Sequence, residues 1–189
     1  MNNGKIIVLS APSGTGKSTI ISRLMQRPEQ KLGFSVSATS RKPRGAERDG
    51  VDYYFLTPEE FGRRVEAGDF VEWAEVYAGT RYGTLASEVE RVTGRGDNLI
   101  MDIDVQGAMN VKKRYGARAL TIFVEPPSLA VLEQRLRDRN TDDEESIRRR
   151  LAKAEYEMGF APGYDLRVVN DNLDEAVDRI ADAIADFTK

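Results

Sequence analysis

Residues 5–27 constrain the fold most, because a buried strand, a glycine-rich loop and a helix are expected there in direct succession. Residues 5–10 read KIIVLS, a short β-branched and apolar run typical of a strand that is buried on both faces. The loop APSGTGKST occupies residues 11–19, and the helical pattern after it ends before Pro28. The order strand, loop, helix is the context in which a phosphate-binding loop is found.

The same alternation of strand and helix continues through the second half of the chain. Strand patterns lie at 98–104, 119–125 and 166–170, and helical patterns lie at 106–115, 128–139 and 173–187. Strands that alternate with helices of this length indicate a parallel sheet covered on both sides, and so an α/β fold. A chain of 189 residues is long enough for one such domain with a small insertion.

Residues 34–96 break this rhythm and predict a small lobe of mixed strands and helices. Short alternating runs such as FSVSATS, VDYYFL and FVEWAEVY are separated there by glycine, proline and charged residues. Thr57 is followed by proline and, three residues later, by Glu60, which predicts a capped helix that ends near Gly68. A second helix is expected from residue 84 or 85 to residue 94.

Composition limits the chemistry that the chain can perform. It contains no cysteine and no histidine, so disulfides, thiolate zinc sites, a histidine general base and histidine-bound metals are excluded. A net charge of −3 argues against broad nucleic-acid binding. No apolar run is long enough to cross a membrane and the first ten residues lack a secretory pattern, so we expect a cytoplasmic protein without a membrane partner.

The loop at residues 11–19 offers the groups that bind a nucleoside triphosphate. Glycines let several backbone N–H groups approach phosphate oxygens, and the start of the helix adds partial positive charge. Lys17 supplies a mobile cation, while the Ser18 hydroxyl and, through water, the Asp102 carboxylate are expected to hold Mg²⁺. The expected ATP-binding residues of the loop are Ala11, Pro12, Ser13, Gly14, Thr15, Gly16, Lys17, Ser18 and Thr19. The alternatives are a glycine turn before a surface lysine and an ordinary strand-end aspartate.

Ala11 stands where the strict loop pattern has glycine. Its methyl group is tolerable as long as the backbone there keeps a negative φ.

A second phosphate site is expected in the small lobe. Arg41 and Arg44 lie three residues apart around Pro43, and the hydroxyls of Tyr53 and Tyr82 could add donors to a phosphomonoester. The alternative is a solvated basic loop.

Two acids, Glu72 and Asp104, lie among apolar residues with strand patterns. Carboxylates only accept hydrogen bonds, so they complement the N1–H and amino group of guanine and repel the N1 acceptor of adenine. Hydroxyls of Ser37 and Thr84 could serve the same base. Either acid could instead be a paired structural carboxylate.

Arg135 and Arg139 lie four residues apart in one helical pattern, and Arg150 follows a capping-box sequence at residues 141–144. Like charges on one helix face repel unless an anion joins them. The alternative is a surface covered with ion pairs to nearby acids.

Taken in order, SAPSGTGKST, FSVSATSRKPRGAERDGVDYYF, FVEWAEVYAGTRYGT, IMDIDVQGA, RLRDRNTDDEESIRRRL and VVNDNL resemble the guanylate kinase family over nearly the whole chain. The resemblance implies transfer of a phosphoryl group from MgATP to GMP on a five-stranded parallel sheet. It implies GMP contacts from the residues that the chemistry above also proposed, namely Ser37, Arg41, Arg44, Tyr53, Glu72, Tyr82, Thr84 and Asp104. It also implies that Arg135, Arg139 and Arg150 close over the transferring group and that Asn170 lies near the adenine.

The resemblance further implies three parts within a single domain: a core of about 1–33, 97–134 and 151–189, a GMP-binding lobe of about 34–96, and a lid of about 135–150. No obligatory protein partner is evident in the sequence. Two alternatives stay open, a kinase for another nucleoside monophosphate and a non-catalytic binding module built on the same fold.

Overall fold

The computed structural model describes residues 4–77, 79–138 and 143–189. Within these residues five parallel strands form the central sheet, in the order β2-β7-β1-β8-β9. Their bounds are Leu32–Phe34 (β2), Asn98–Asp102 (β7), Ile6–Ser10 (β1), Ala119–Glu125 (β8) and Leu166–Val169 (β9). The predicted α/β fold with a parallel sheet is confirmed, and β2 is a strand that the sequence patterns did not separate from the lobe.

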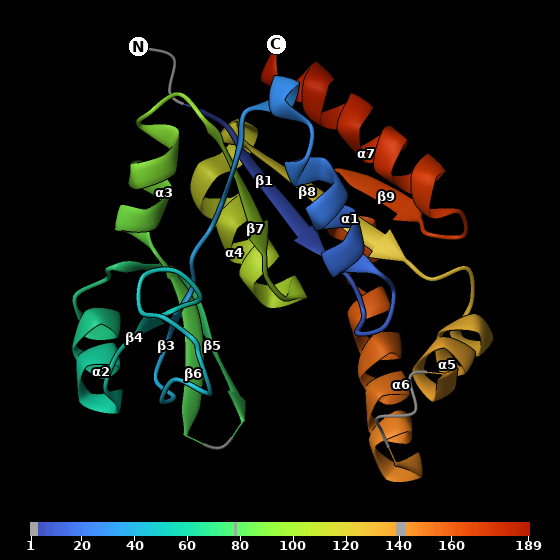
Figure 1. Ribbon diagram of the computed structural model, residues 1–189, viewed down its shortest axis with the longest axis horizontal. Helices are drawn as coiled ribbons and strands as arrows, with labels where there is room; N and C mark the ends of the chain where they lie inside the picture. The colour runs from blue at the N-terminus through green and yellow to red at the C-terminus, as the bar shows by residue number, and fades with distance from the viewer. Residues whose placement is uncertain (1–3, 78, 139–142) are drawn as a thin grey trace.

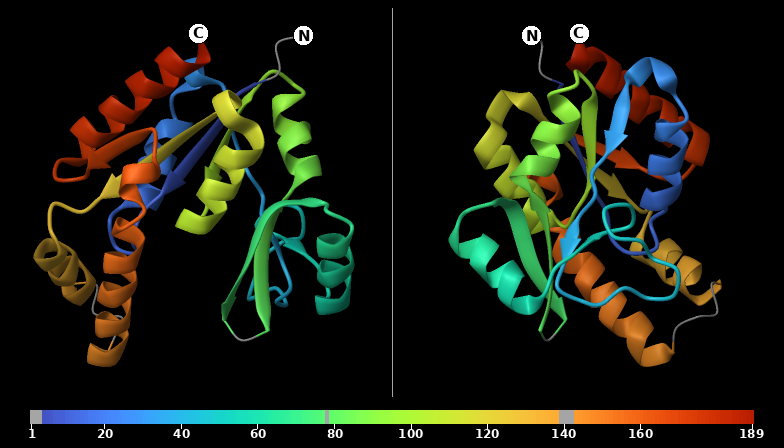
Figure 2. Two further views of the ribbon diagram at one scale, coloured as in Figure 1. Left: turned by 180° about the vertical axis from the view of Figure 1, so that it is seen from behind. Right: turned by 60° about the vertical axis from the view of Figure 1, so that its left-hand side comes forward.

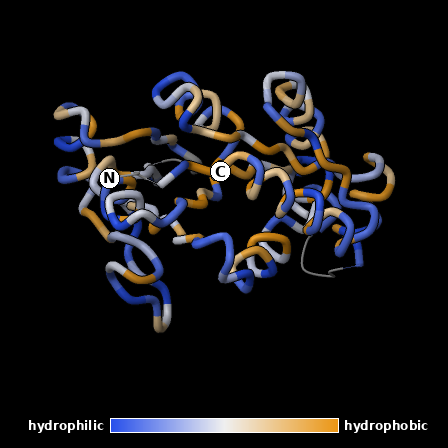
Figure 3. Tube along the Cα trace, turned by 90° about the horizontal axis from the view of Figure 1, so that it is seen from above, coloured by the Kyte–Doolittle hydropathy of each residue, from blue (hydrophilic) through white to orange (hydrophobic). Residues whose placement is uncertain are grey.

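Helices cover both faces of this sheet because its strands alternate their apolar side chains between two cores. Ile6 and Val8 of β1 pack toward α3 (Ala86–Thr93) and α4 (Val105–Tyr115). Ile7 and Leu9 pack toward α1 (Lys17–Met25) and α7 (Leu173–Thr188). Figure 3 shows hydrophilic and hydrophobic residues alternating around the outer helices, as expected for helices that bury one face. Short 3₁₀ turns lie at Pro28–Gln30, Gly116–Arg118 and Ala161–Gly163.

A second, mixed sheet forms the small lobe, which we define as β3–β6 with α2. In the described chain its order is β4-β3-β6-β5, where β3 pairs parallel with β4 and antiparallel with β6. The strands are Ala38–Thr39 (β3), Tyr54–Phe55 (β4), Phe70–Tyr77 (β5) and Thr80–Leu85 (β6). Helix α2 (Pro58–Glu66) begins as predicted, because the Thr57 side chain accepts a hydrogen bond from the backbone N of Glu60.

A helix pair forms the third part of the structure. Helices α5 (Leu129–Asp138) and α6 (Glu144–Met158) pack through Leu132, Leu136, Ile147 and Ala154. The small lobe and this pair both extend from the end of the sheet opposite the chain termini (Figures 1 and 2). The end that carries them is the carboxyl end of β1, where the phosphate loop begins.

One predicted boundary was wrong, and the reason is helix capping. The strand expected at 98–104 ends at Asp102, because Asp104 caps α4 by accepting a hydrogen bond from the backbone N of Gly107 at 2.7 Å. The helix that follows the capping-box sequence at 141–144 begins at Glu144, where Asp143 accepts a hydrogen bond from the backbone N of Ser146 at 2.7 Å. Thr141 lies outside the described residues.

Candidate active site

The phosphate loop joins β1 to α1 in a conformation that requires glycine at two positions. Gly14 and Gly16 have φ angles of 96° and 99°, which L side chains rarely adopt. A Cβ atom at Gly16 would lie 2.6 Å from Nδ2 of Asn170. Among the described residues the non-glycine residue with positive φ is Lys31, so Ala11 meets the condition under which its methyl group is tolerable.

Lys17 and Asp102 form an ion pair at the base of this loop. Asp102 ends β7, which pairs with β1 so that Leu9 and Asp102 lie in register. The loop therefore faces the ends of two neighbouring parallel strands, the edge where ligands bind in open α/β sheets. A cleft of about 420 Å³ opens there, lined by the loop, residues 102–104 and three side chains of α6, namely Arg150, Lys153 and Glu157.

A second pocket of about 200 Å³ lies against the small lobe. Its lining residues are Ser37, Tyr53, Glu72, Ala74, Tyr82, Gly83, Asp102, Ile103 and Asp104. The segment 102–104 lines both this pocket and the cleft at the phosphate loop. The two cavities therefore meet at the end of β7, with the loop on one side and the small lobe on the other.

Glu72 and Asp104, the two acids singled out in the sequence, come together in this second pocket. A Cβ atom at Gly107 would lie 3.0 Å from Glu72 Oε2 and 3.2 Å from Asp104 Oδ1, so both carboxylates converge on one point of α4. Burial raises the pKa of Glu72 to about 7; the hydrogen bond from Thr84 opposes this rise and the Asp104 charge adds to it. Thr84 Oγ1 donates that bond to Glu72 Oε1 at 2.7 Å.

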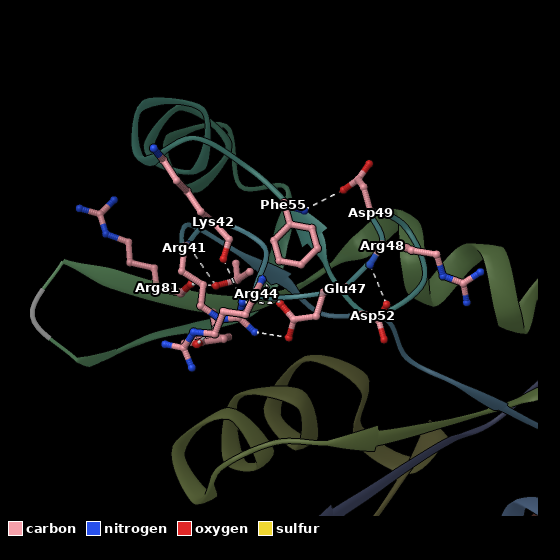
Figure 4. A network of polar contacts seen from close by, with 11 residues as sticks. Arg41, Lys42, Arg44, Glu47, Arg48, Asp49, Asp52, Phe55 and Arg81 are labelled. Atoms are coloured by element: carbon pink, nitrogen blue, oxygen red, sulfur yellow. Dashed lines mark hydrogen bonds and ion pairs between the residues drawn. The ribbon is translucent and has the colours of Figure 1, made fainter.

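Arg41 lies next to two tyrosines that line this pocket, although it is not itself a lining residue. Its guanidinium lies over the Tyr53 ring at 4.9 Å, and its Nε donates to the Tyr82 hydroxyl at 3.2 Å. Arg44 lies on the same loop with an exposed side chain and does not line the pocket. The structure thus brings Arg41, Tyr53 and Tyr82 together, whereas the Arg44 side chain is exposed. Figure 4 shows Arg41 and Arg44 on the loop that they share with Glu47.

The helix pair contacts the phosphate loop through Arg150, whose Nη1 donates to Ser13 Oγ at 2.6 Å. Arg135 Nη2 donates to the backbone O of Asn170 at 3.0 Å, and Asn170 Nδ2 donates to the backbone O of Thr15 at 2.7 Å. Asn170 therefore ties the phosphate loop to β9 and α5. Arg139 lies outside the described residues.

Comparison with known proteins agrees with this geometry. A family model described as guanylate kinase matches residues 3–187 of the chain. The chain belongs to the guanylate kinase family. Guanylate kinase of Porphyromonas gingivalis is 56% identical over 183 residues, 97% of each chain. That of Bacteroides thetaiotaomicron is 53% identical over 184 residues, 97% of this chain and 90% of the other.

The fold is also similar to a solved member of the family. The crystal structure of guanylate kinase from Anaplasma phagocytophilum superposes with a TM-score of 0.76 at 32% identity, covering 99% of this chain and 87% of that one. Within the described residues no helix of this guanylate kinase is both long and apolar enough to cross a membrane.

Sequence reasoning missed three charged residues at the site of this guanylate kinase. Lys153 and Glu157 follow Arg150 at positions i+3 and i+7 of α6, a spacing that places all three on one helix face. Burial raises the pKa of Glu157, although the charges of Lys153 and Lys17 oppose the rise. The third residue, Glu47, forms an ion pair with Arg41. The signal in the sequence that could have indicated this pair is the position of Glu47, six residues after Arg41 in the same loop.

Proposed function

We propose that this chain, a guanylate kinase and thus an ATP:GMP phosphotransferase, holds MgATP on the phosphate loop and GMP in the small-lobe pocket. The observation that carries the proposal is that residues 102–104 line both cavities, so substrates bound in the two cavities would lie end to end. In this assignment the core, GMP-binding lobe and lid span about 1–33, 97–134 and 151–189, about 34–96, and about 135–150. The protein works in the cytoplasm on free nucleotides, without an obligatory protein partner.

On the donor side the residues from Ala11 to Thr19 bind the triphosphate. Their backbone N–H groups and the start of α1 favour phosphate oxygens, and Lys17 exchanges Asp102 for the β- and γ-phosphates. Asn170 supports this loop through Thr15, close to the expected adenine.

The residues present fit magnesium, which would enter with the nucleotide. Ser18 and Asp102 offer a hydroxyl and a carboxylate oxygen, the hard ligands that Mg²⁺ prefers. Within the described chain no group of three or more acidic side chains is arranged to hold a metal ion, as expected when phosphates and water supply most of the ligands. When bound, the ion neutralises charge on the β- and γ-phosphate oxygens.

On the acceptor side the pocket binds the purine base of GMP at one end and its phosphate at the other. Glu72 and Asp104 accept from the N1–H and amino group of guanine, with Ser37 and Thr84 as hydroxyl partners. Arg41 and Arg44, with the hydroxyls of Tyr53 and Tyr82, hold the GMP phosphate.

The transfer itself needs no general base, because the attacking GMP phosphate oxygen is already deprotonated near neutral pH. The barrier is the repulsion between two anions, so catalysis consists of positioning and charge neutralisation. Lys17 and Arg41 supply positive charge from the core and the lobe, and Arg135, Arg139 and Arg150 supply it from the lid. Closure of lobe and lid would exclude water, the competing acceptor.

A coupled ADP-release assay tests this assignment with MgATP and, separately, GMP, AMP, UMP and CMP. Strong turnover with GMP alone supports both the kinase and the two carboxylates as guanine readers. Turnover with another base would overturn the role of Glu72 and Asp104, and no turnover with any of the four would point to a binding module.

A further inference from the structure

The loop at residues 41–47 is closed by Glu47, a residue to which the proposed mechanism gives no role. Its carboxylate faces the Arg41 guanidinium with two parallel contacts, Nη1 to Oε2 at 2.6 Å and Nη2 to Oε1 at 2.8 Å. Oε2 also accepts from the backbone N of Arg44 at 2.8 Å, and the backbone N of Glu47 donates to the backbone O of Arg44 at 3.1 Å. One side chain thus joins both arginines of the phosphate site (Figure 4).

Both members of this pair are charged near neutral pH. The Arg41 guanidinium and the Arg44 backbone lower the pKa of Glu47 to about 2, so the carboxylate is ionised throughout the neutral range. The side chains of Arg41 and Glu47 are 12% and 25% exposed, so solvent reaches the pair only in part. Bidentate arginine–carboxylate contacts of this kind fix the plane of the guanidinium.

Counting the donors of Arg41 shows how completely its orientation is set. The guanidinium has five N–H bonds. Nε donates to Tyr82, Nη1 donates to Glu47 and to the backbone O of Lys42 at 3.0 Å, and Nη2 donates to Glu47. These contacts use four of the five. Glu47 takes the Nη1–Nη2 edge, while the pocket residue Tyr82 lies at Nε, so the carboxylate does not separate Arg41 from the pocket.

We propose that Glu47 is a positioning residue for GMP: it holds Arg41 against Tyr53 and Tyr82 and holds the Arg44 backbone, so that the GMP phosphate meets a preformed site. The inference rests on the proposed function, since it concerns the acceptor phosphate of that reaction. The alternative is that Glu47 competes with GMP, because its carboxylate occupies N–H donors of Arg41 that the GMP phosphate needs. The two roles predict opposite changes in the KM for GMP when the charge of Glu47 is removed.

The experiment compares Glu47→Gln and Glu47→Asp with the wild-type protein, with GMP varied at saturating MgATP and, separately, MgATP varied at saturating GMP. Loss of the bidentate contact frees Arg41 to adopt many rotamers, and the substrate must then order it. We expect Glu47→Gln to raise the KM for GMP about tenfold, with kcat within about twofold and the KM for ATP unchanged. Glu47→Asp, which keeps the charge on a shorter side chain, should recover part of the loss.

Glu60→Gln is the matched control. Glu60 lies on α2 in the same lobe and pairs with two arginines, Arg63 and Arg64, but it does not line the pocket. This variant should leave all three kinetic constants at wild-type values. Thermal unfolding of each variant by circular dichroism verifies that the proteins compared are folded.

Inhibition by guanosine separates positioning from a general loosening of the lobe. Guanosine carries the base but no phosphate, so Glu47→Gln should leave its inhibition constant unchanged if Glu47 acts on the phosphate site. An unchanged or lowered KM for GMP, or equal weakening of guanosine and GMP, would overturn the proposal. Failure of the proposed function is distinguishable, because the wild-type protein itself would then not phosphorylate GMP.

Discussion

Replacing Glu72 with glutamine should stabilise the protein while it removes activity toward GMP. Glu72 is 8% exposed, and its pKa of about 7 compares with an ordinary value of 4.5. Above pH 7 the folded protein therefore holds a charge that burial disfavours. At about 1.4 kcal/mol for each pKa unit, the cost is about 3 kcal/mol of unfolding free energy.

The sign of the pH dependence follows from proton binding. Between pH 4.5 and 7 the folded protein retains a proton on Glu72 that the unfolded chain has released, so this carboxyl group lowers the stability of the wild-type protein as pH rises. The loss levels off above pH 7. Glutamine has no proton to release and keeps a similar shape. The variant therefore lacks this contribution to the dependence of stability on pH.

Urea unfolding followed by circular dichroism, in steps from pH 5 to pH 8.5, measures the effect. The stability of Glu72→Gln minus that of the wild type should grow by up to about 3 kcal/mol across this range, because all other titrating groups are shared by the two proteins. The variant Glu60→Gln, at a partly exposed carboxylate whose pKa is lowered by Arg64, should show no gain. A difference that stays constant with pH would refute the reasoning. Turnover with GMP should be lost in Glu72→Gln, because the amide places a donor opposite the donors of guanine.

Three further predictions concern the two nucleotide sites. The KM of the wild-type protein for GMP should rise as pH falls below about 7, approaching tenfold per pH unit, because guanine requires ionised Glu72. Initial rates from pH 6 to 8 measure this KM, and a KM that does not change with pH would contradict the prediction. Lys17→Ala should lower turnover by orders of magnitude with nearly unchanged circular dichroism, and wild-type turnover would refute the phosphate-loop assignment. Asn170→Ala removes the hydrogen bond to the buried carbonyl of Thr15, so it should lower the free energy of unfolding in urea by about 1–3 kcal/mol. It should also raise the KM for ATP more than the KM for GMP. Equal changes in the two KM values would argue against a role at the phosphate loop.

Local patterns in the sequence were sufficient for the phosphate loop and for most elements around it. The loop is contiguous, its glycines adopt the positive φ angles that only glycine tolerates well, and the flanking strand and helix follow from short-range periodicity. The capped start of α2 at Thr57 depends on residues three apart, which is why it could be predicted. Asp104 continues the strand pattern in the sequence but caps α4 in the structure, so the pattern placed the end of β7 two residues too late.

The chain by itself determined which chemical groups are available, and the tertiary structure decided which of them meet. Glu72 and Asp104 are 32 residues apart and converge because β5 packs beside α4, while Asn170 reaches Thr15 across 155 residues because β9 lies two strands from β1. Arg41 and Glu47 are close in the sequence, but the guanidinium and the carboxylate meet only when the loop folds back on itself. Residue types and local spacing set the conformations of single elements, whereas contacts between distant elements depend on how their buried faces pack, and packing is a property of the whole fold.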